Sequence, residues 1–385
     1  MGVSGKAKVL VIGAGFAGVP LAIELTSKGL DVTLVDSKPY FEVVFANART
    51  LVEPADLKPH GVFVQGHVKE LHPIHALLDD GRRLDFDFAA VCTGSSQQFG
   101  KGGAATIEER RAELKAQHDA LVAAPAVVVV GGGPLGVELV GEVATDMPSK
   151  PTFLVHSGDR LMPSLPPRAS RLALSWLKGH GCKVLLNNRL QLDPASDPAS
   201  APAGPLVTAK GEELPRGALV LWATGTRPAT GLMKPALAEA LDSDGLIKAT
   251  NQYRAAPRGA QVEPTLQVVG HPTLFALGDA NNVKEEKLAY LAQAQAPVVA
   301  GNIAALAAAK EAAAAGGAAG QAAHPPKLSA WRPGMGLPTI MIVSLGRSYG
   351  VAHLAYFTFG GWLVSKIKDI NTFISKSRHG VCLAP

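Results

Sequence analysis

Short runs of consecutive apolar residues, each followed by a glycine-rich turn, mark the first part of the chain. Residues 8–12, Lys-Val-Leu-Val-Ile, form the first run, and its β-branched residues without polar alternation are typical of a parallel strand covered on both faces. A glycine-rich turn at 13–18 and a helix-like segment at 19–28 follow, and a second apolar run at 32–35 ends at Asp36. The pattern predicts a strand, a turn, a helix and a second parallel strand.

The turn has the sequence Gly-Ala-Gly-Phe-Ala-Gly, and each glycine meets a physical need. Gly13 allows the tight turn, Gly15 lets the backbone approach a pyrophosphate, and Gly18 lets the helix pack close to the strand. N–H groups at the helix N-terminus attract phosphates, and a carboxylate at the end of the second strand accepts hydrogen bonds from ribose hydroxyls. We therefore expect a dinucleotide site formed by Gly13, Ala14, Gly15, Phe16, Ala17, Gly18 and Asp36.

The same arrangement occurs a second time. An apolar run at 126–130 leads into Gly-Gly-Gly-Pro-Leu-Gly at 131–136, and the pattern predicts a helix at 137–143 and a strand at 152–155. Two such units in one chain predict two bound dinucleotides. The second is expected to be held by Gly131, Gly133 and Gly136.

The second unit differs from the first at the end of its second strand. His156 and Ser157 stand where an acidic residue would favour a free ribose 2′-hydroxyl and disfavour a 2′-phosphate. Arg160 lies close by in the sequence, and it either tolerates a 2′-phosphate or is a solvated loop charge. Either NADH or NADPH is therefore compatible with this unit.

Three further strand-like runs end in a glycine motif. They are Val91-Cys92-Thr93-Gly94, the segment 219–228 with Ala-Thr-Gly-Thr-Arg-Pro, and the segment 273–279, which ends in Gly278-Asp279. The two Thr-Gly pairs are expected where the chain passes close to a cofactor.

These elements predict an α/β fold with two Rossmann-like dinucleotide-binding domains and a small C-terminal α+β region. The first domain is expected to be discontinuous, at 1–125 and 249–328, with the second at 126–248 and the C-terminal region at 329–385. An Asp- and Pro-rich stretch at 193–205 is predicted to be a surface loop. An Ala-rich stretch at 307–326 is predicted to extend a helix into a linker.

Composition narrows the class of protein. Of 385 residues, 47% are apolar and 18% charged, which excludes wholesale disorder, and a net charge of +5 does not by itself indicate a nucleic-acid-binding protein. Cys92, Cys182 and Cys382 lie far apart and form no C-x-x-C motif, so we expect neither a redox dithiol nor a metal site. No signal-peptide pattern opens the chain, and we expect a cytoplasmic protein.

The order of the motifs resembles that of the two-dinucleotide-binding flavoprotein reductases. In that superfamily the first loop holds FAD, the second holds NADH or NADPH, and the Asp of the Gly-Asp motif, here Asp279, bonds the flavin ribityl chain. The resemblance narrows to one family at three places, namely Gly-Val-Glu at 136–138 and the segments 287–292 and 341–351. Over nearly its whole length the chain resembles the ferroptosis-suppressor-protein family, the mitochondrion-associated homologues of apoptosis-inducing factor.

The resemblance implies an FAD-dependent reductase, similar in build to type II NADH dehydrogenases, that passes hydride from NAD(P)H to flavin and electrons to a membrane quinone. Arg49 resembles the loop arginine near the FAD pyrophosphate, and Val68 resembles the strand residue whose backbone meets the adenine. Glu138 resembles the acid beside the nicotinamide and Lys287 lies where the family approaches the isoalloxazine, so these two are the expected catalytic residues. The expected flavin site also includes Thr93, Gly94, Gly278 and Asp279.

Residues 330–385 combine positive charge with aromatic side chains. They hold six basic residues against one acidic residue, and seven of the aromatic residues of the chain. This mixture favours an anionic membrane surface, where Lys and Arg meet lipid headgroups and Trp and Tyr lie at the interface. Residues 348–365 carry no formal charge but have too few Leu and Ile for a membrane span. We expect them to pack on the flavin domain with one face on the membrane, a C-terminal region without membrane contact being the alternative.

Two other functions stay open at this point. The first is the same reductase with another electron acceptor, such as ferredoxin, monodehydroascorbate or oxygen. The second is a signalling or nucleic-acid-binding flavoprotein, against which the tail lacks a continuous Lys/Arg stripe.

Overall fold

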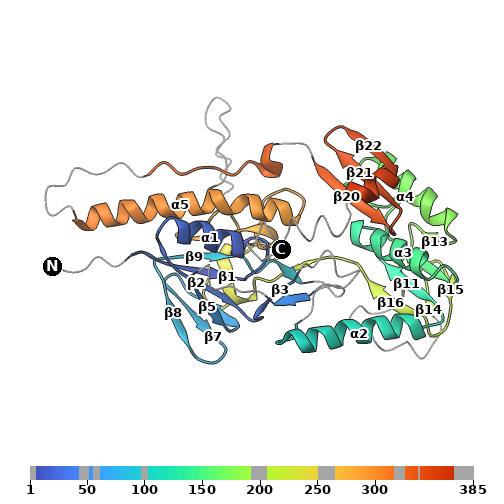
Figure 1. Ribbon diagram of the computed structural model, residues 1–385, viewed down its shortest axis with the longest axis horizontal. Coiled ribbons are helices and arrows are strands. Elements are labelled where there is room, and N and C mark those ends of the chain that lie inside the picture. The colour runs from blue at the N-terminus through green and yellow to red at the C-terminus, as the bar shows by residue number, and fades with distance from the viewer. Residues whose placement is uncertain are drawn as a thin grey trace.

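Two parallel sheets with helices packed on them lie side by side along the long axis of the molecule, and a smaller sheet lies over the second (Figure 1). The computed structural model describes residues 6–42, 52–54, 61–96, 103–191, 206–249, 265–315, 326–336 and 339–367. Both expected β-α-β units are present, so the predicted α/β fold is confirmed.

The first sheet has the strand order β18-β19-β9-β1-β2-β5. All neighbours pair in parallel except β18 with β19. The strands are β1 Lys8–Ile12, β2 Asp31–Asp36, β5 Val62–Gln65, β9 Phe88–Val91, β18 Gln267–Val268 and β19 His271–Ala276.

Residues of β1 alternate between two cores because successive side chains of a strand point to opposite faces. Val9 and Val11 pack under α1 (Gly18–Ser27) and α5 (Ala289–Ala315), whereas Leu10 faces the other core. That other face is covered by the antiparallel sheet of β6 Val68–Leu71, β7 His75–Leu78 and β8 Arg83–Asp85, and by the 3₁₀ turns η3 Gly231–Met233 and η4 Ala238–Ala240.

Helix α5 is, within the described part of the chain, the one helix long and apolar enough to cross a membrane by length and composition. It packs along α1, with Leu291, Val299 and Ile303 buried in the core that contains Leu21 and Leu25. These contacts are those of a core helix, and the helix continues to Ala315, into the stretch expected to extend one.

The second sheet has the order β13-β12-β11-β16, all parallel. Its strands are β11 Val127–Val130, β12 Thr152–Val155, β13 Lys183–Leu185 and β16 Leu219–Trp222, with the short hairpin β14 Leu206–Val207 and β15 Glu213–Leu214 beside them. Helices α3 (Pro134–Asp146) and α4 (Pro167–Gly179) pack on the sheet. The expected loop at 193–205 lies outside the described residues.

Two connections link the first half of the molecule, built on the first sheet, to the second half, built on the second sheet. Helix α2 (Ile107–Ala123) begins at a capping box of Thr106 and Glu109, and its Arg110 forms a buried ion pair of 2.8 Å with Glu42 of β3 (Tyr40–Glu42), which pairs with β4 (Val52–Pro54). A two-stranded antiparallel ribbon joins β10 (Ser95–Ser96) to β17 (Arg227–Pro228).

The C-terminal region contacts both halves. Trp331 is buried in the core of the first half, and its indole N–H donates to the carboxylate of Glu285, which also accepts the N–H of Gly334 in η6 (Pro333–Gly336). The antiparallel sheet β20 (Ile340–Leu345), β21 (Tyr349–Leu354) and β22 (Phe357–Gly361), followed by α6 (Trp362–Ile367), lies over α3 and α4 (Figure 1).

The expectation that residues 348–365 pack on the flavin domain is therefore wrong. The sheet shares its core with Val137 and Val140 of α3, through Val343 and Leu345 of β20. Glycine at position 141 lets β20 pack this close to α3, because a Cβ there would lie 2.9 Å from the Cα of Leu345. The buried Trp331 likewise does not belong to an exposed aromatic surface.

Candidate functional site

The first glycine loop has the geometry that its sequence requires. Gly13 has a φ of +103°, and a Cβ there would lie 2.6 Å from the carbonyl oxygen of Cys92. A Cβ on Gly18 would collide with the carbonyl oxygen of Gly13, so only glycine lets α1 approach β1 this closely. A Cβ on Gly15 would meet nothing within 4 Å. Protein atoms therefore crowd the loop at Gly13 and Gly18, whereas the space beside Gly15 is free for a ligand.

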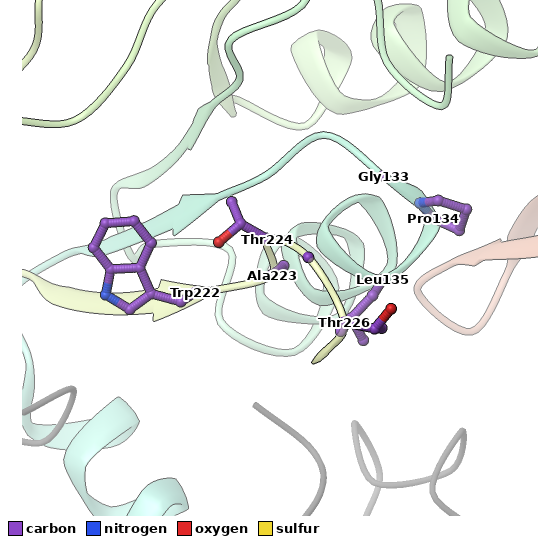
Figure 2. Close-up of a pocket in the computed structure, with 8 residues that line it drawn as sticks. Gly133, Pro134, Leu135, Trp222, Ala223, Thr224 and Thr226 are labelled. Carbon is purple, nitrogen blue, oxygen red and sulfur yellow. The ribbon is translucent and has the colours of Figure 1, made fainter. Parts of the chain in front are cut away.

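The second glycine loop repeats this arrangement. Gly131 has a φ of +117°, with a Cβ position 2.5 Å from the carbonyl oxygen of Ala223, and a Cβ on Gly136 would collide with Gly131. Gly133 again faces open space. It borders a cavity of about 210 Å³ between the start of α3 and the end of β16, shown in Figure 2 and lined by Gly133, Pro134, Leu135, Trp222, Ala223, Thr224, Gly225 and Thr226.

Several residues expected to hold the flavin lie together at the carboxyl edge of the first sheet. Strands β1, β9 and β19 are parallel neighbours there, so the loop at 13–18 lies beside Thr93-Gly94 and Gly278-Asp279. The N–H of Gly278 donates to Gln295 Oε1 at 2.8 Å, and Ser95 Oγ donates to Asp279 Oδ2 at 2.6 Å.

Two further observations fit an FAD molecule at this edge. Thr93 Oγ1 is buried without a hydrogen-bond partner among the described residues, so a bound polar group can satisfy it. Asp36 stands at the end of β2, where its Oδ2 accepts the N–H of Ala14 at 2.6 Å and its Oδ1 accepts the N–H of Lys38 at 2.8 Å. The carboxylate is thus oriented at the glycine loop, as ribose recognition requires.

Lys287 supports the segment after the Gly-Asp motif. Its Nζ donates to the carbonyl oxygens of Asn281 and Val283, at 2.8 and 3.1 Å, and to Asn281 Oδ1 at 3.2 Å. Burial lowers the pKa of Lys287, and the charges of Glu285 and Asp279 oppose that shift. The half-buried side chain is therefore tied through its ammonium group to the segment 281–283, which follows Asp279.

Glu138 lies on α3. Its Oε1 accepts the backbone N–H of Ser344 at 3.0 Å and the Ser344 hydroxyl at 3.2 Å, which joins the second glycine unit to β20. Val68 is buried at the start of β6 and pairs with Leu78. Arg49 lies outside the described residues. The roles expected for these three residues stay predictions.

At the end of β12, His156 occupies the position that Asp36 has in the first unit. Its Nδ1 accepts the N–H of Gly132 at 3.1 Å, and burial lowers its pKa. Arg160 donates to the carbonyl oxygens of Leu165, at 2.6 Å, and Pro163, at 2.5 Å, and so holds its own loop. These two bonds use two of the five N–H groups of the guanidinium.

Sequence reasoning missed Ser95, Gln295 and Trp222. Ser95 follows Thr93-Gly94 closely, which is a local hint, but its partner Asp279 is 184 positions away. Trp222 precedes Ala-Thr-Gly and resembles an ordinary buried strand residue until the cavity is seen.

The two described cysteines do not form a redox pair. Cys92 is buried in the core under α1 and Cys182 in the core under α3 and α4, and both are free. Burial raises the pKa of both thiols, that of Cys182 to about 11, which disfavours the reactive thiolate. Among the residues that the structure describes, no group of three metal-ligating side chains occurs.

A family model described as pyridine nucleotide-disulphide oxidoreductase matches residues 7–296, which include both glycine loops and the Gly-Asp motif. The chain belongs to this family. It is 29% identical to ferroptosis suppressor protein 1 of Xenopus tropicalis, over 96% of this chain and 94% of the relative. It is 28% identical to apoptosis-inducing factor homologue B of Dictyostelium discoideum, over 79% of this chain and 82% of the relative.

Among solved structures, the sulfide:quinone oxidoreductase of Aquifex aeolicus matches with a TM-score of 0.71 and 16% identity, covering 97% of this chain and 92% of the other. The resemblance to the ferroptosis-suppressor and apoptosis-inducing-factor homologues is confirmed. Family and site agree that this chain is an FAD-dependent oxidoreductase that uses NAD(P)H.

Proposed function

We propose that the chain is an NAD(P)H:quinone oxidoreductase that works at a membrane surface. The observation that carries the proposal is the ribbon of β10 and β17, which continues the two Thr-Gly segments and pairs Ser95 with Pro228 and Ser96 with Arg227. It brings the carboxyl edges of both sheets close together. A nucleotide on one edge can therefore react with a flavin on the other without a long-range carrier.

FAD would supply the acceptance of hydride and the onward transfer of electrons. The protein residues would bind and orient the FAD. Asp36 and the first glycine loop would hold the adenosine and pyrophosphate end, and Asp279 would hold the ribityl chain. Lys287 would stabilise negative charge near the reacting ring, since its half-buried ammonium group bonds the segment that follows Asp279.

A quinone as acceptor is supported by the name of one structural neighbour, a sulfide:quinone oxidoreductase, and by exposed apolar side chains at both ends of β22. Tyr356 and Phe357 are 83% and 73% exposed, and Trp362 and Leu363 are 69% and 55% exposed. Large apolar side chains left in water commonly mark an interaction site, and aromatic residues favour the membrane interface, where lipid quinones are found.

The test is stopped-flow reduction of the FAD-loaded protein by NADH and by NADPH, followed by a short-chain ubiquinone. Bleaching of the flavin band and its return on addition of quinone are the expected results. Bleaching without return would keep the reductase and reject the quinone. A flavin band that neither nucleotide bleaches would reject the proposed enzyme altogether.

A further inference from the structure

A buried glutamine of α5 holds the turn that carries the Gly-Asp motif. Gln295 is 1% exposed, and its Oε1 accepts the N–H of Gly278 at 2.8 Å and the side-chain amide of Asn281 at 3.2 Å. Gly278 has a φ of +66°, and a Cβ there would lie 3.2 Å from Ala292 Cβ and 3.7 Å from Ala17 Cβ. One oxygen atom of Gln295 therefore fixes both ends of this closely packed turn.

The amide nitrogen of Gln295 continues these contacts to a carboxylate. Its Nε2 donates to Glu285 Oε1 at 2.6 Å. Glu285 also accepts the indole N–H of Trp331 at 3.1 Å and, on Oε2, the backbone N–H of Gly334 at 2.7 Å. Donors from α5 and from the C-terminal region thus meet on one carboxylate, and hydrogen bonds to a charged acceptor are stronger than those between neutral groups.

The C-terminal segment meets this carboxylate at a turn with an uncommon backbone conformation. Gly334 and Met335 have φ values of +62° and +60°, and a positive φ is uncommon for a residue with a side chain such as methionine. Trp331, three positions before Gly334, is 4% exposed in the core of the first half. A continuous chain of hydrogen bonds therefore runs from this segment through Glu285 and Gln295 to the Gly-Asp motif.

We propose that Gln295 and Glu285 are positioning residues for the flavin, and that they couple FAD binding to the packing of the C-terminal segment 329–336. Both act through the turn that carries Asp279, because a binding group is effective only where neighbouring hydrogen bonds fix its position. Such coupling is reciprocal, so disturbing the pair should loosen the flavin and the segment together. The inference rests on the proposed function in placing the ribityl chain at Asp279, and it is independent of the electron acceptor.

The experiment exchanges the two side chains, which are nearly equal in shape, and uses the FAD-loaded full chain at about pH 8, well above the ordinary pKa of a glutamate. In Gln295→Glu two carboxylates face each other across the 2.6 Å contact, so FAD should dissociate about tenfold faster or more, followed by the rise of flavin fluorescence on dilution. Hydrogen exchange of the amides at 329–336 should rise as well. The double variant Gln295→Glu/Glu285→Gln again places a donor opposite a carboxylate, and both measurements should return to within about threefold of wild type.

Two further variants separate this effect from a general loss of stability. Glu285→Gln alone leaves an amide N–H₂ group facing a donor of either Gln295 or Gly334, and it should speed FAD dissociation about threefold or more even if Gln295→Glu does not fold. Asn188→Leu is the matched control in the second half, because Asn188 is a buried amide whose Nδ2 donates to Thr208 Oγ1 at 3.1 Å. It should lower the Tm and leave both measurements within about twofold of wild type.

The inference is overturned if Gln295→Glu releases FAD at the wild-type rate, if the double variant releases it as fast as Gln295→Glu, or if Asn188→Leu releases it equally fast. Unchanged exchange at 329–336 in Gln295→Glu also overturns it, because reciprocal coupling requires that change. These outcomes leave the proposed function standing as long as Asp279→Ala loses flavin. If Asp279→Ala retains flavin as wild type does, the placement of the ribityl chain fails, and the inference fails with it.

Discussion

Gly133 and Gly136 are three positions apart on the second glycine loop, yet a methyl group has opposite consequences at the two sites. At Gly133 it points into open space beside the cavity, so Gly133→Ala should fold normally and weaken NAD(P)H binding by about tenfold. At Gly136 it collides with the carbonyl of Gly131, so Gly136→Ala should cost about 2 kcal/mol or more of stability despite the better helix propensity of alanine. Thermal unfolding and nucleotide titration separate the two effects, and equal loss of stability in both variants would contradict the assignment.

Asp279 is expected to matter for the flavin more than for the fold. Asp279→Ala removes the acceptor of the Ser95 hydroxyl at the carboxyl edge of the first sheet and should lower the flavin content of the purified protein several-fold, or about 1–2 kcal/mol of binding. Ser95→Ala is the control, because it keeps the carboxylate and should retain most of the flavin. The flavin-to-protein absorbance ratio is the measurement, and equal loss in both variants would place the effect in their mutual hydrogen bond.

Acid should destabilise the protein partly through His156. Its pKa is lowered in the folded state by burial, so below pH 6.5 the unfolded chain binds more protons than the folded one, and stability falls as the pH falls. His156→Asn removes this contribution. From about pH 7.5 to about pH 5.5 the Tm of wild type should therefore drop further than that of the variant. The difference between the two curves is informative, because burial also lowers the pKa of His75, which is present in both proteins. Parallel curves would rule out a lowered pKa of His156 in the folded state.

Glycines with a steric role in the backbone were predictable from the sequence. Side chains that bond to each other across a long stretch of sequence were not. Gly13 and Gly18 stand out because their spacing has a steric meaning, which the close carbonyl contacts bear out. The bond between Ser95 and Asp279 joins residues 184 positions apart and depends on β9 and β19 being neighbours, which no local pattern specifies.

At the scale of elements, the contact between α3 and β20 depends on Gly141. A Cβ at this position would lie 2.9 Å from the Cα of Leu345, so Gly141→Ala should push the C-terminal sheet off α3 and cost roughly 2 kcal/mol. Gly179→Ala is the matched control. It lies at the end of α4 with nothing within 4 Å of its Cβ position, and it should be neutral or slightly stabilising. Chemical denaturation compares the two, and a Gly141 variant as stable as wild type would refute the close packing.

The same contact explains why the place of the C-terminal sheet was not foreseen. The sequence predicted a small C-terminal α+β region at 329–385, but the surface that this region covers depends on Gly141 and on Glu138, whose carboxylate accepts the N–H and the hydroxyl of Ser344. Both lie inside a helix whose pattern already suits packing on its own sheet. One face of α3 therefore packs on its own sheet and another contacts β20, and the sequence pattern indicated only the first of these contacts.

At the scale of the whole molecule, the exposed ends of β22 should carry membrane attachment. Replacing Phe357 and Trp362 together by serine should reduce co-sedimentation with anionic liposomes about tenfold or more, since each aromatic side chain contributes to burial at the interface. Reduction of a short-chain, water-soluble quinone should not change. Replacing Val62 and Ile74, which are 59% and 65% exposed on the first half, is the control and should leave liposome binding intact. Equal loss in both pairs would indicate general hydrophobicity instead of a defined surface.

The order of strands in the first sheet has a consequence for synthesis on the ribosome. β19 pairs with β9, and α5 covers α1, yet both emerge only after the entire second half has been made. The parallel sheet of the second half can form as soon as β16 has been made, although its helices still lack the C-terminal sheet, whereas the first half waits with Leu21 and Leu25 uncovered and without Asp279. Flavin binding is thus expected late in synthesis. A nascent chain whose synthesis stops before β19 would have a first half without flavin and with apolar side chains exposed to aggregation.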